Sequence, residues 1–248
     1  MHLVDPLTVY VVTVIFIATL IRSTLGFGEA LFSVPLLALR IPVAVAAPLA
    51  VTVSILVAAI IVVQDWRRIE FRSAAGLMAA SLVGIPLGVL LLATANDHVV
   101  KLILGSVIVL FAIVSLSSGT VAGQPRDGRV WLLTCGVLAG ILGGAYGMNG
   151  PPLAIYGAFR RWSPRQFRAT LQGYFLPASI VGLIGYAFIG LWSTEVTRYL
   201  LYSLPGVGVA TLLGRSINRR MQVDGFIRVV YIGLLLIGLL LLHQAMRS

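Results

Sequence analysis

Long apolar stretches, separated by short polar segments, follow one another along the whole chain. There are eight of them: Pro6–Leu39, Pro42–Val63, Ser73–Ala95, Val99–Leu116, Val130–Phe159, Ala169–Trp192, Tyr199–Leu213 and Val229–Leu242. About 20 apolar residues suffice to cross a bilayer as an α-helix, whereas the strands of a membrane barrel alternate apolar and polar residues. The pattern therefore predicts an all-α polytopic membrane protein.

Two stretches, residues 6–39 and 130–159, are too long for one ordinary span, and both are interrupted by glycine and proline. The first contains GFGEALFSVPLLAL from Gly26, and the second contains GMNGPPLAIYGA from Gly147. At about 1.5 Å per residue, the arms after these interruptions are too short to cross about 30 Å of hydrocarbon. We expect each stretch to be a broken-helix hairpin, with half-helices beginning just after Gly28 and Gly150. Counting each hairpin as one helix gives eight full spans.

The charges of the loops indicate how the chain crosses the membrane. The segments at residues 65–72, 160–168 and 215–228 are basic, whereas those at 96–98 and 193–198 are not. Basic loops favour the cytoplasm. If both long stretches are hairpins that leave on the side where they enter, all three basic loops are cytoplasmic and both chain ends face outward. The alternative, eight single crossings, places the first two basic loops on opposite sides.

The order of features repeats in the two halves of the chain. Each half opens with a hairpin and closes with a charged pair before its last apolar stretch, Asp97 with Lys101 and Asp224 with Arg228, whose spacing is typical of helix-start ion pairs. The predicted division is a first half-repeat at residues 1–118, a polar linker at 119–129 and a second half-repeat at 130–248. Five membrane segments per half is an odd number, so the second half must be inverted, an architecture found in transporters.

Composition agrees with this interpretation: 59% of the residues are hydrophobic, 10% are charged, and the mean hydropathy is +1.01. The net charge of +10 comes from arginines in short loops. These serve as topology determinants and contacts for lipid headgroups, so nucleic acid is not an expected partner. The single cysteine, Cys135, excludes an intramolecular disulfide.

The two hairpin tips are the candidate binding site. A helix that begins inside the bilayer presents unpaired backbone N–H groups and the positive end of its dipole, which together attract anions. Pro151 suits the first turn of a helix, where a missing N–H costs nothing. Irregular backbone is tolerated at this depth only where protein buries it or it lines a cavity. The alternative role of these glycines is close packing between helices.

Glu29 and Arg22 are the charged residues of the first hairpin. A carboxylate in an apolar site either pairs or takes up a proton. Glu29 is therefore interpreted either as a proton-coupling group beside the anion site or as the structural partner of Arg22. For Arg22 itself, the alternatives are snorkelling to the cytoplasmic surface, pairing with Glu29 and holding an anionic substrate.

Neutral polar residues complete the candidate set. Asn149 and Gln172 can donate to sulfonate or carboxylate oxygens, and a tyrosine hydroxyl can add to them. The candidate substrate-binding residues are Arg22, Gly26, Gly28, Glu29, Gly147, Asn149, Gly150, Pro151, Tyr156 and Gln172. The three histidines are scattered, so neither a metal site nor a cofactor is expected, and the few acidic residues lie mostly in loops, which argues against an enzyme. The sequence contains no GxxxxGK[ST] motif and so carries no ATP motor of its own.

Three segments resemble the TauE/SafE sulfite exporter family, also called the TSUP permeases. They are GFGEALFSVPLL from Gly26, GMNGPPLAIY from Gly147 and RATLQGYF from Arg168. The resemblance extends over nearly the whole chain and implies an integral membrane permease that moves sulfite, sulfoacetate, thiosulfate or related anions. Glu29 departs from the family pattern, which carries a small or aromatic residue there, so the resemblance implies no role for it.

These observations favour a secondary-active transporter of a small, sulfur-containing anion in the bacterial inner membrane. The expected mechanism is alternating access around a site near the bilayer midplane, with coupling to protons or no coupling. The alternative function is an anion channel or an uncoupled anion permease, because paired helix N-termini can also line a pore. The expected partners are the anionic substrate, protons and the lipid bilayer. The oligomeric state is left open, a homodimer included.

Overall fold

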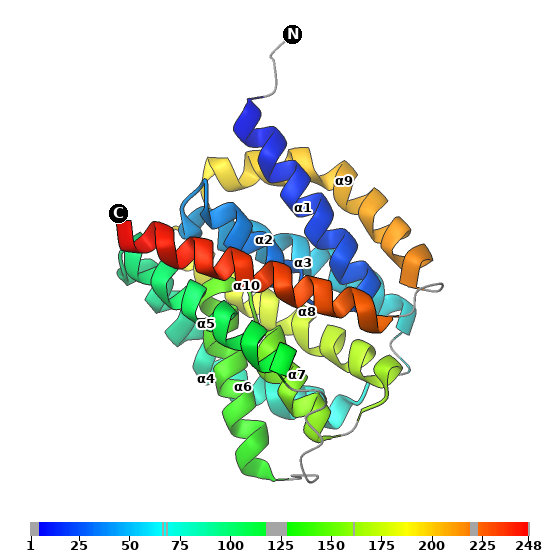
Figure 1. The fold of residues 1–248 in the computed structure, drawn as a ribbon. Coiled ribbons are helices and arrows are strands. Elements are labelled where there is room, and N and C mark those ends of the chain that lie inside the picture. Colours follow the sequence, from blue (N-terminus) through cyan, green and yellow to red (C-terminus); the bar gives the residue numbers. More distant parts are fainter. Residues whose placement is uncertain are drawn as a thin grey trace.

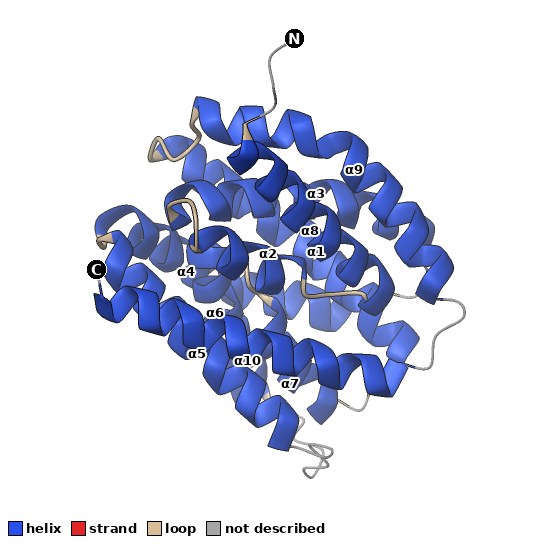
Figure 2. Ribbon diagram, turned by 45° about the horizontal axis from the view of Figure 1, so that its top comes forward, coloured by secondary structure: helices blue, strands red, loops and turns tan. Residues whose placement is uncertain are grey.

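A computed structural model describes residues 5–65, 67, 69–117, 128–160, 162–218 and 223–247. The described residues form ten α-helices and no strand (Figures 1 and 2). The helices are α1 (Pro6–Leu25), α2 (Glu29–Ala38), α3 (Val43–Asp65), α4 (Phe71–Thr94), α5 (Asp97–Ser117), α6 (Arg129–Tyr146), α7 (Gly150–Phe159), α8 (Pro164–Phe188), α9 (Thr194–Asn218) and α10 (Val223–Arg247).

Seven of these helices are long and apolar enough to cross a membrane. They are α1, α3, α4, α5, α6, α8 and α9, while α2 and the portion of α10 from Tyr231 form shorter apolar helices. Many large hydrophobic side chains on the outside of the bundle are exposed, for example Leu110 on α5 and Leu212 on α9. The protein is thus a polytopic α-helical membrane protein. Most of the predicted linker at 119–129 and the side chains of Asp224 and Arg228 lie outside the described residues.

Both long apolar stretches break where the glycines predicted. Helix α1 ends at Leu25 and α2 begins at Glu29, with Gly26 and Gly28 between them at φ values of 91° and 100°. Helix α6 ends before Gly147, whose φ is 69°. These are left-handed conformations that glycine adopts without strain. Helix α7 begins at Gly150 itself, one residue earlier than predicted.

Each short helix runs back along the longer helix before it. The Tyr10 hydroxyl near the start of α1 donates to the carbonyl of Leu36 near the end of α2, at 2.5 Å. In the second hairpin, the rings of Trp131 at the start of α6 and Phe159 at the end of α7 lie with centroids 5.0 Å apart. The end of each short helix therefore returns to the side of the bundle where the hairpin began.

The predicted basic segments at 65–72 and 160–168 meet at one end of the bundle. The backbone N–H of Glu70 donates to the hydroxyl of Thr170 at 3.1 Å. At the other end, the N–H of Val43 donates to Asp97, which also pairs with Lys101 at 2.8 Å, as its spacing predicted. Eight single crossings would place the two basic segments on opposite sides, so this contact favours the hairpin arrangement.

Helix pairs from different halves build the rest of the bundle. Helix α4 packs parallel to α6, with Gly84 against Gly140 and Gly88 against the backbone of residues 141–145. Helix α1 likewise packs parallel to α9, where Gly206 faces Phe16. Helices α5 and α10 run antiparallel in Figure 1. The antiparallel pair α3 and α8 lies next to the hairpin tips and positions the candidate site.

Candidate functional site

The two hairpin tips meet around a small cavity. Its walls come from the first turn of α2, from the tip before α7, and from single residues of α1, α3 and α8: Arg22, Phe27, Gly28, Glu29, Ala30, Leu31, Ser54, Gly147, Met148, Gly150 and Phe175. The cavity has a volume of about 20 Å³, which holds about one water molecule. A polyatomic anion such as sulfite is larger, so the tips or the side chains around them must move apart before one can bind.

A buried ion pair forms one wall of this cavity. Both Arg22 and Glu29 are 2% exposed, and the Nη1 of Arg22 donates to a carboxylate oxygen of Glu29. The second carboxylate oxygen accepts from the Thr19 hydroxyl at 3.4 Å. Pairing offsets part of the large cost of burying two charges. The structure thus places Arg22 in the interior rather than at the cytoplasmic surface, so the snorkelling alternative is wrong.

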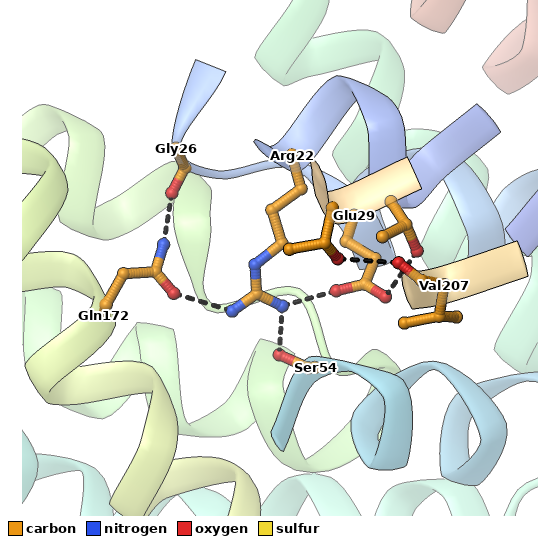
Figure 3. Close-up of polar contacts among 8 residues, drawn as sticks. Arg22, Gly26, Glu29, Ser54, Gln172 and Val207 are labelled. Carbon is orange, nitrogen blue, oxygen red and sulfur yellow. Dashed lines mark hydrogen bonds and ion pairs between the residues drawn. The ribbon is translucent and has the colours of Figure 1, made fainter. Parts of the chain in front are cut away.

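Neutral groups also hold the guanidinium of Arg22 (Figure 3). Nη1 donates to the hydroxyl of Ser54 at 2.7 Å, and Nη2 donates to the side-chain carbonyl of Gln172 at 2.8 Å. The amide of Gln172 in turn donates to the carbonyl of Gly26, which the helix break leaves available. The ring of Phe175 lies 5.6 Å from the guanidinium carbon, within the range of a cation–π contact. The Arg22 position is therefore fixed from α3 and α8, besides its carboxylate partner on α2.

These contacts leave one donor of Arg22 over. Its Nε is buried and makes no hydrogen bond within the part of the chain that the structure describes. An unsatisfied buried donor of this kind is unusual and costly. Because Arg22 lines the cavity, this donor is one that an oxygen of a bound anion could satisfy.

The two helix N-termini differ in what they offer an anion. The first turn of α2 presents the N–H groups of Glu29, Ala30 and Leu31, because the residues four positions earlier lie outside the helix and cannot accept helical hydrogen bonds. All three residues line the cavity. In α7, the residues after Gly150 are Pro151 and Pro152, which carry no N–H. Free N–H groups are predicted at both tips, but because of these prolines α2 supplies most of them.

The remaining predicted residues lie behind the cavity wall. Asn149 packs against Gly143 of α6, and its amide lies 3.5 Å from the hydroxyl of Tyr174. Tyr156 is buried against Trp162, with ring centroids 5.6 Å apart. Pro151 is buried in the first turn of α7 and does not line the cavity. Of the ten candidates, Arg22, Gly28, Glu29, Gly147 and Gly150 line the cavity, while Gly26 and Gln172 hold Arg22.

Sequence reasoning missed three polar or aromatic contacts of the ion pair. They are Thr19, Ser54 and Phe175. Thr19 lies three residues before Arg22, so a polar stripe on one face of α1 was a usable signal. Nothing in the apolar stretch around Ser54 indicated that its hydroxyl would face an arginine of another helix.

Comparison with known proteins identifies the family. A sequence model described as "Sulfite exporter TauE/SafE" matches residues 11–241, which is nearly the whole chain. The chain belongs to the TauE/SafE family. One relative, described as "Probable sulfite/organosulfonate exporter TauE" from Cupriavidus necator, is 30% identical over 152 residues. That alignment covers 61% of this chain and 58% of the relative, so the chain matches little more than half of that protein. No solved structure matches the TauE/SafE chain.

Proposed function

We propose that this TauE/SafE protein is a secondary transporter of a small, sulfur-containing anion in the bacterial inner membrane. The candidate substrates are sulfite, sulfonates such as sulfoacetate, and thiosulfate. The observation that carries the proposal is the cavity between the two hairpin tips, where Arg22 and the first turn of α2 converge. The family is described as sulfite exporters, and the C. necator relative as a probable exporter of sulfite and organosulfonates, which supports this substrate class.

The chemistry of the cavity suits an oxyanion. A guanidinium with a spare N–H and a turn of free backbone N–H groups together match oxygens that point in several directions. Apart from Glu29 and Ser54, the remaining wall residues are apolar or glycine, and such low-dielectric surroundings strengthen these contacts. A cavity that holds only about one water is too small to form part of a continuous anion pore, which favours a transporter over a channel.

The packing of the helices supports two inverted halves as the moving parts. Helices α1 to α5 of the first half correspond in order to α6 to α10 of the second. Replacing each helix by its counterpart turns the pair α1–α9 into the pair α6–α4, and both pairs are parallel. The same replacement leaves the pairs α3–α8 and α5–α10 unchanged, and both of these pairs are antiparallel. At the tips, Gly26 packs against Arg168 of α8, whereas Gly147 packs against Val51 of α3. We infer that rocking of one half against the other opens the cavity alternately to each side.

A binding screen tests the proposal. The purified protein is heated in detergent with sulfite, thiosulfate, sulfoacetate, taurine or simple carboxylates, and the unfolding temperature is recorded. A ligand at 100 times its Kd stabilises the native state by about 2.7 kcal/mol, so binding of one class raises Tm. Flux into liposomes that saturates with the concentration of the same anion distinguishes a transporter from a channel. The absence of a shift with every anion would contradict an anion site.

A further inference from the structure

The charge balance of the cavity requires compensation when an anion binds. Among the described residues that line it, Arg22 and Glu29 are the charged ones, and they neutralise each other. An anion that enters beside an intact pair brings its charge into a buried site with only dipoles to offset it, which is unfavourable in a low-dielectric interior. Protonation of Glu29 removes one negative charge and leaves Arg22 free to pair with the anion.

We propose that the Glu29 carboxylate and the substrate anion compete for Arg22, so that each anion binds together with one proton on Glu29. This inference rests on the proposed function and adds its coupling ion and the residue that carries it. In the empty site the carboxylate holds Arg22; in the loaded site the anion replaces the carboxylate on the guanidinium, and a proton from solution occupies a Glu29 oxygen. Anion and proton then cross in the same direction and leave together.

The contacts of Arg22 and Glu29 suit this exchange. Ser54 and Gln172 hold the guanidinium through neutral oxygens, so Arg22 keeps its position when Glu29 is protonated. The Nε, which has no partner within the described chain, adds a second contact for an incoming anion. Protonated Glu29 keeps a contact as well, because the hydroxyl of Thr19 can accept a hydrogen bond as readily as it donates one.

Other charged groups lie away from the carboxylate. Arg168 of α8 covers the outer face of Gly26 and does not line the cavity. Helices α5 and α10 also pack against α2. Their described charged or titratable side chains are Asp97, His98 and Lys101 at the start of α5, Tyr231 of α10, whose ring packs on Phe111, and His243 and Arg247 in the last turns of α10. Contacts there join α10 to Leu39, beyond the end of α2 opposite Glu29. Within the described residues, Glu29 is thus the carboxylate placed to take up the proton.

Proton uptake during binding tests the exchange directly. Thiosulfate and sulfoacetate are suitable probes, because neither changes its charge between about pH 6 and pH 8. Each is mixed with purified wild-type protein in weakly buffered detergent solution containing a pH indicator. We expect uptake of about one proton per bound anion, and an affinity that falls about tenfold per pH unit wherever Glu29 is ionised in the free protein and protonated in the complex.

Glu29→Gln and Glu195→Gln form a matched pair of variants. Glu195 lies exposed in the first turn of α9, away from the site, so its variant should behave like the wild type. Glu29→Gln should bind the same anions without proton uptake and with an affinity independent of pH. If Glu29→Gln does not fold, the wild-type uptake alone decides.

Three results would overturn the inference, and they are distinguishable. Binding without proton uptake in the wild type shows that the Arg22–Glu29 pair stays intact, and equal uptake in Glu29→Gln shows that another group takes up the proton. In both cases the anion site stands and the coupling through Glu29 fails. Absence of binding by either anion to the wild type removes the proposed function and the coupling with it.

Discussion

Helices α4 and α6 approach so closely that one added methyl group should destabilise the protein. A β-carbon at Gly84 would lie 2.2 Å from the carbonyl oxygen of Val137, 2.8 Å from the nitrogen of Ile141 and 3.0 Å from the Cα of Gly140. All three are backbone atoms, so no side-chain rotation can relieve the overlap. Small residues four apart on both helices, Gly84 with Gly88 and the series at 136, 140 and 144, allow this contact.

The size of the effect follows from this geometry. Restoring ordinary contact at Gly84→Ala requires the helices to separate by about 1 Å, and overpacking of this kind costs about 1–3 kcal/mol or more. The intrinsic helix preference of alanine over glycine returns only about 0.5–1 kcal/mol. Because α6 also carries the second hairpin tip, the same shift should disturb the cavity.

Thermal unfolding of the purified protein in detergent measures this cost. At about 2–4 °C per kcal/mol for a chain of this length, we expect Gly84→Ala to lower Tm by several degrees. The control is Gly208→Ala on α9, where a β-carbon would meet nothing within 4 Å; its Tm should be unchanged or slightly raised. A Gly84→Ala protein as stable as the wild type would refute the close backbone contact.

Three further predictions address the charges, the topology and the hairpin. Replacing either Arg22 or Glu29 alone with methionine should cost about 3–5 kcal/mol, whereas the double replacement should cost far less than the sum; additive losses in thermal unfolding would argue against their pairing. In a cysteine-free background, single cysteines at Arg72 and Ser163, in the first two basic segments, should react with an impermeant reagent from the same face of the membrane, and labelling from opposite faces would contradict the hairpins. Tyr10→Phe should lower the free energy of unfolding by about 0.5–1.5 kcal/mol, because it removes the hydrogen bond to the Leu36 carbonyl of α2. An unchanged Tm would show that this hydrogen bond does not stabilise the hairpin.

Much of the local structure could be predicted from the residues themselves. Apolar stretches of spanning length predict membrane helices because every backbone polar group must be satisfied inside the bilayer. Gly26, Gly28 and Gly147 marked the breaks, since their left-handed conformations disfavour other residues. The loop arginines indicated which segments share an end of the bundle, and the bond between Glu70 and Thr170 agrees with that grouping.

The contents of the site were harder to predict, because partners far apart in sequence decide them. Pairing with Glu29 was one of three alternatives for Arg22, and only the packing of α1 against α2 selected it. Asn149 has the same chemistry as Gln172, yet it turns toward Tyr174, away from the cavity, because it fills the space left by Gly143. Side-chain chemistry predicted what each residue could bind, but its direction depended on neighbours from other helices.

The sequence by itself determined that the chain spans a membrane, where its helices break and that each break exposes a helix start, because these depend on hydrophobicity, loop charge and backbone conformation over a few residues. The tertiary structure decided that Ser54, Gln172 and Glu29 converge on one guanidinium. Those contacts join residues up to 150 positions apart, and only the packing of whole helices brings them together.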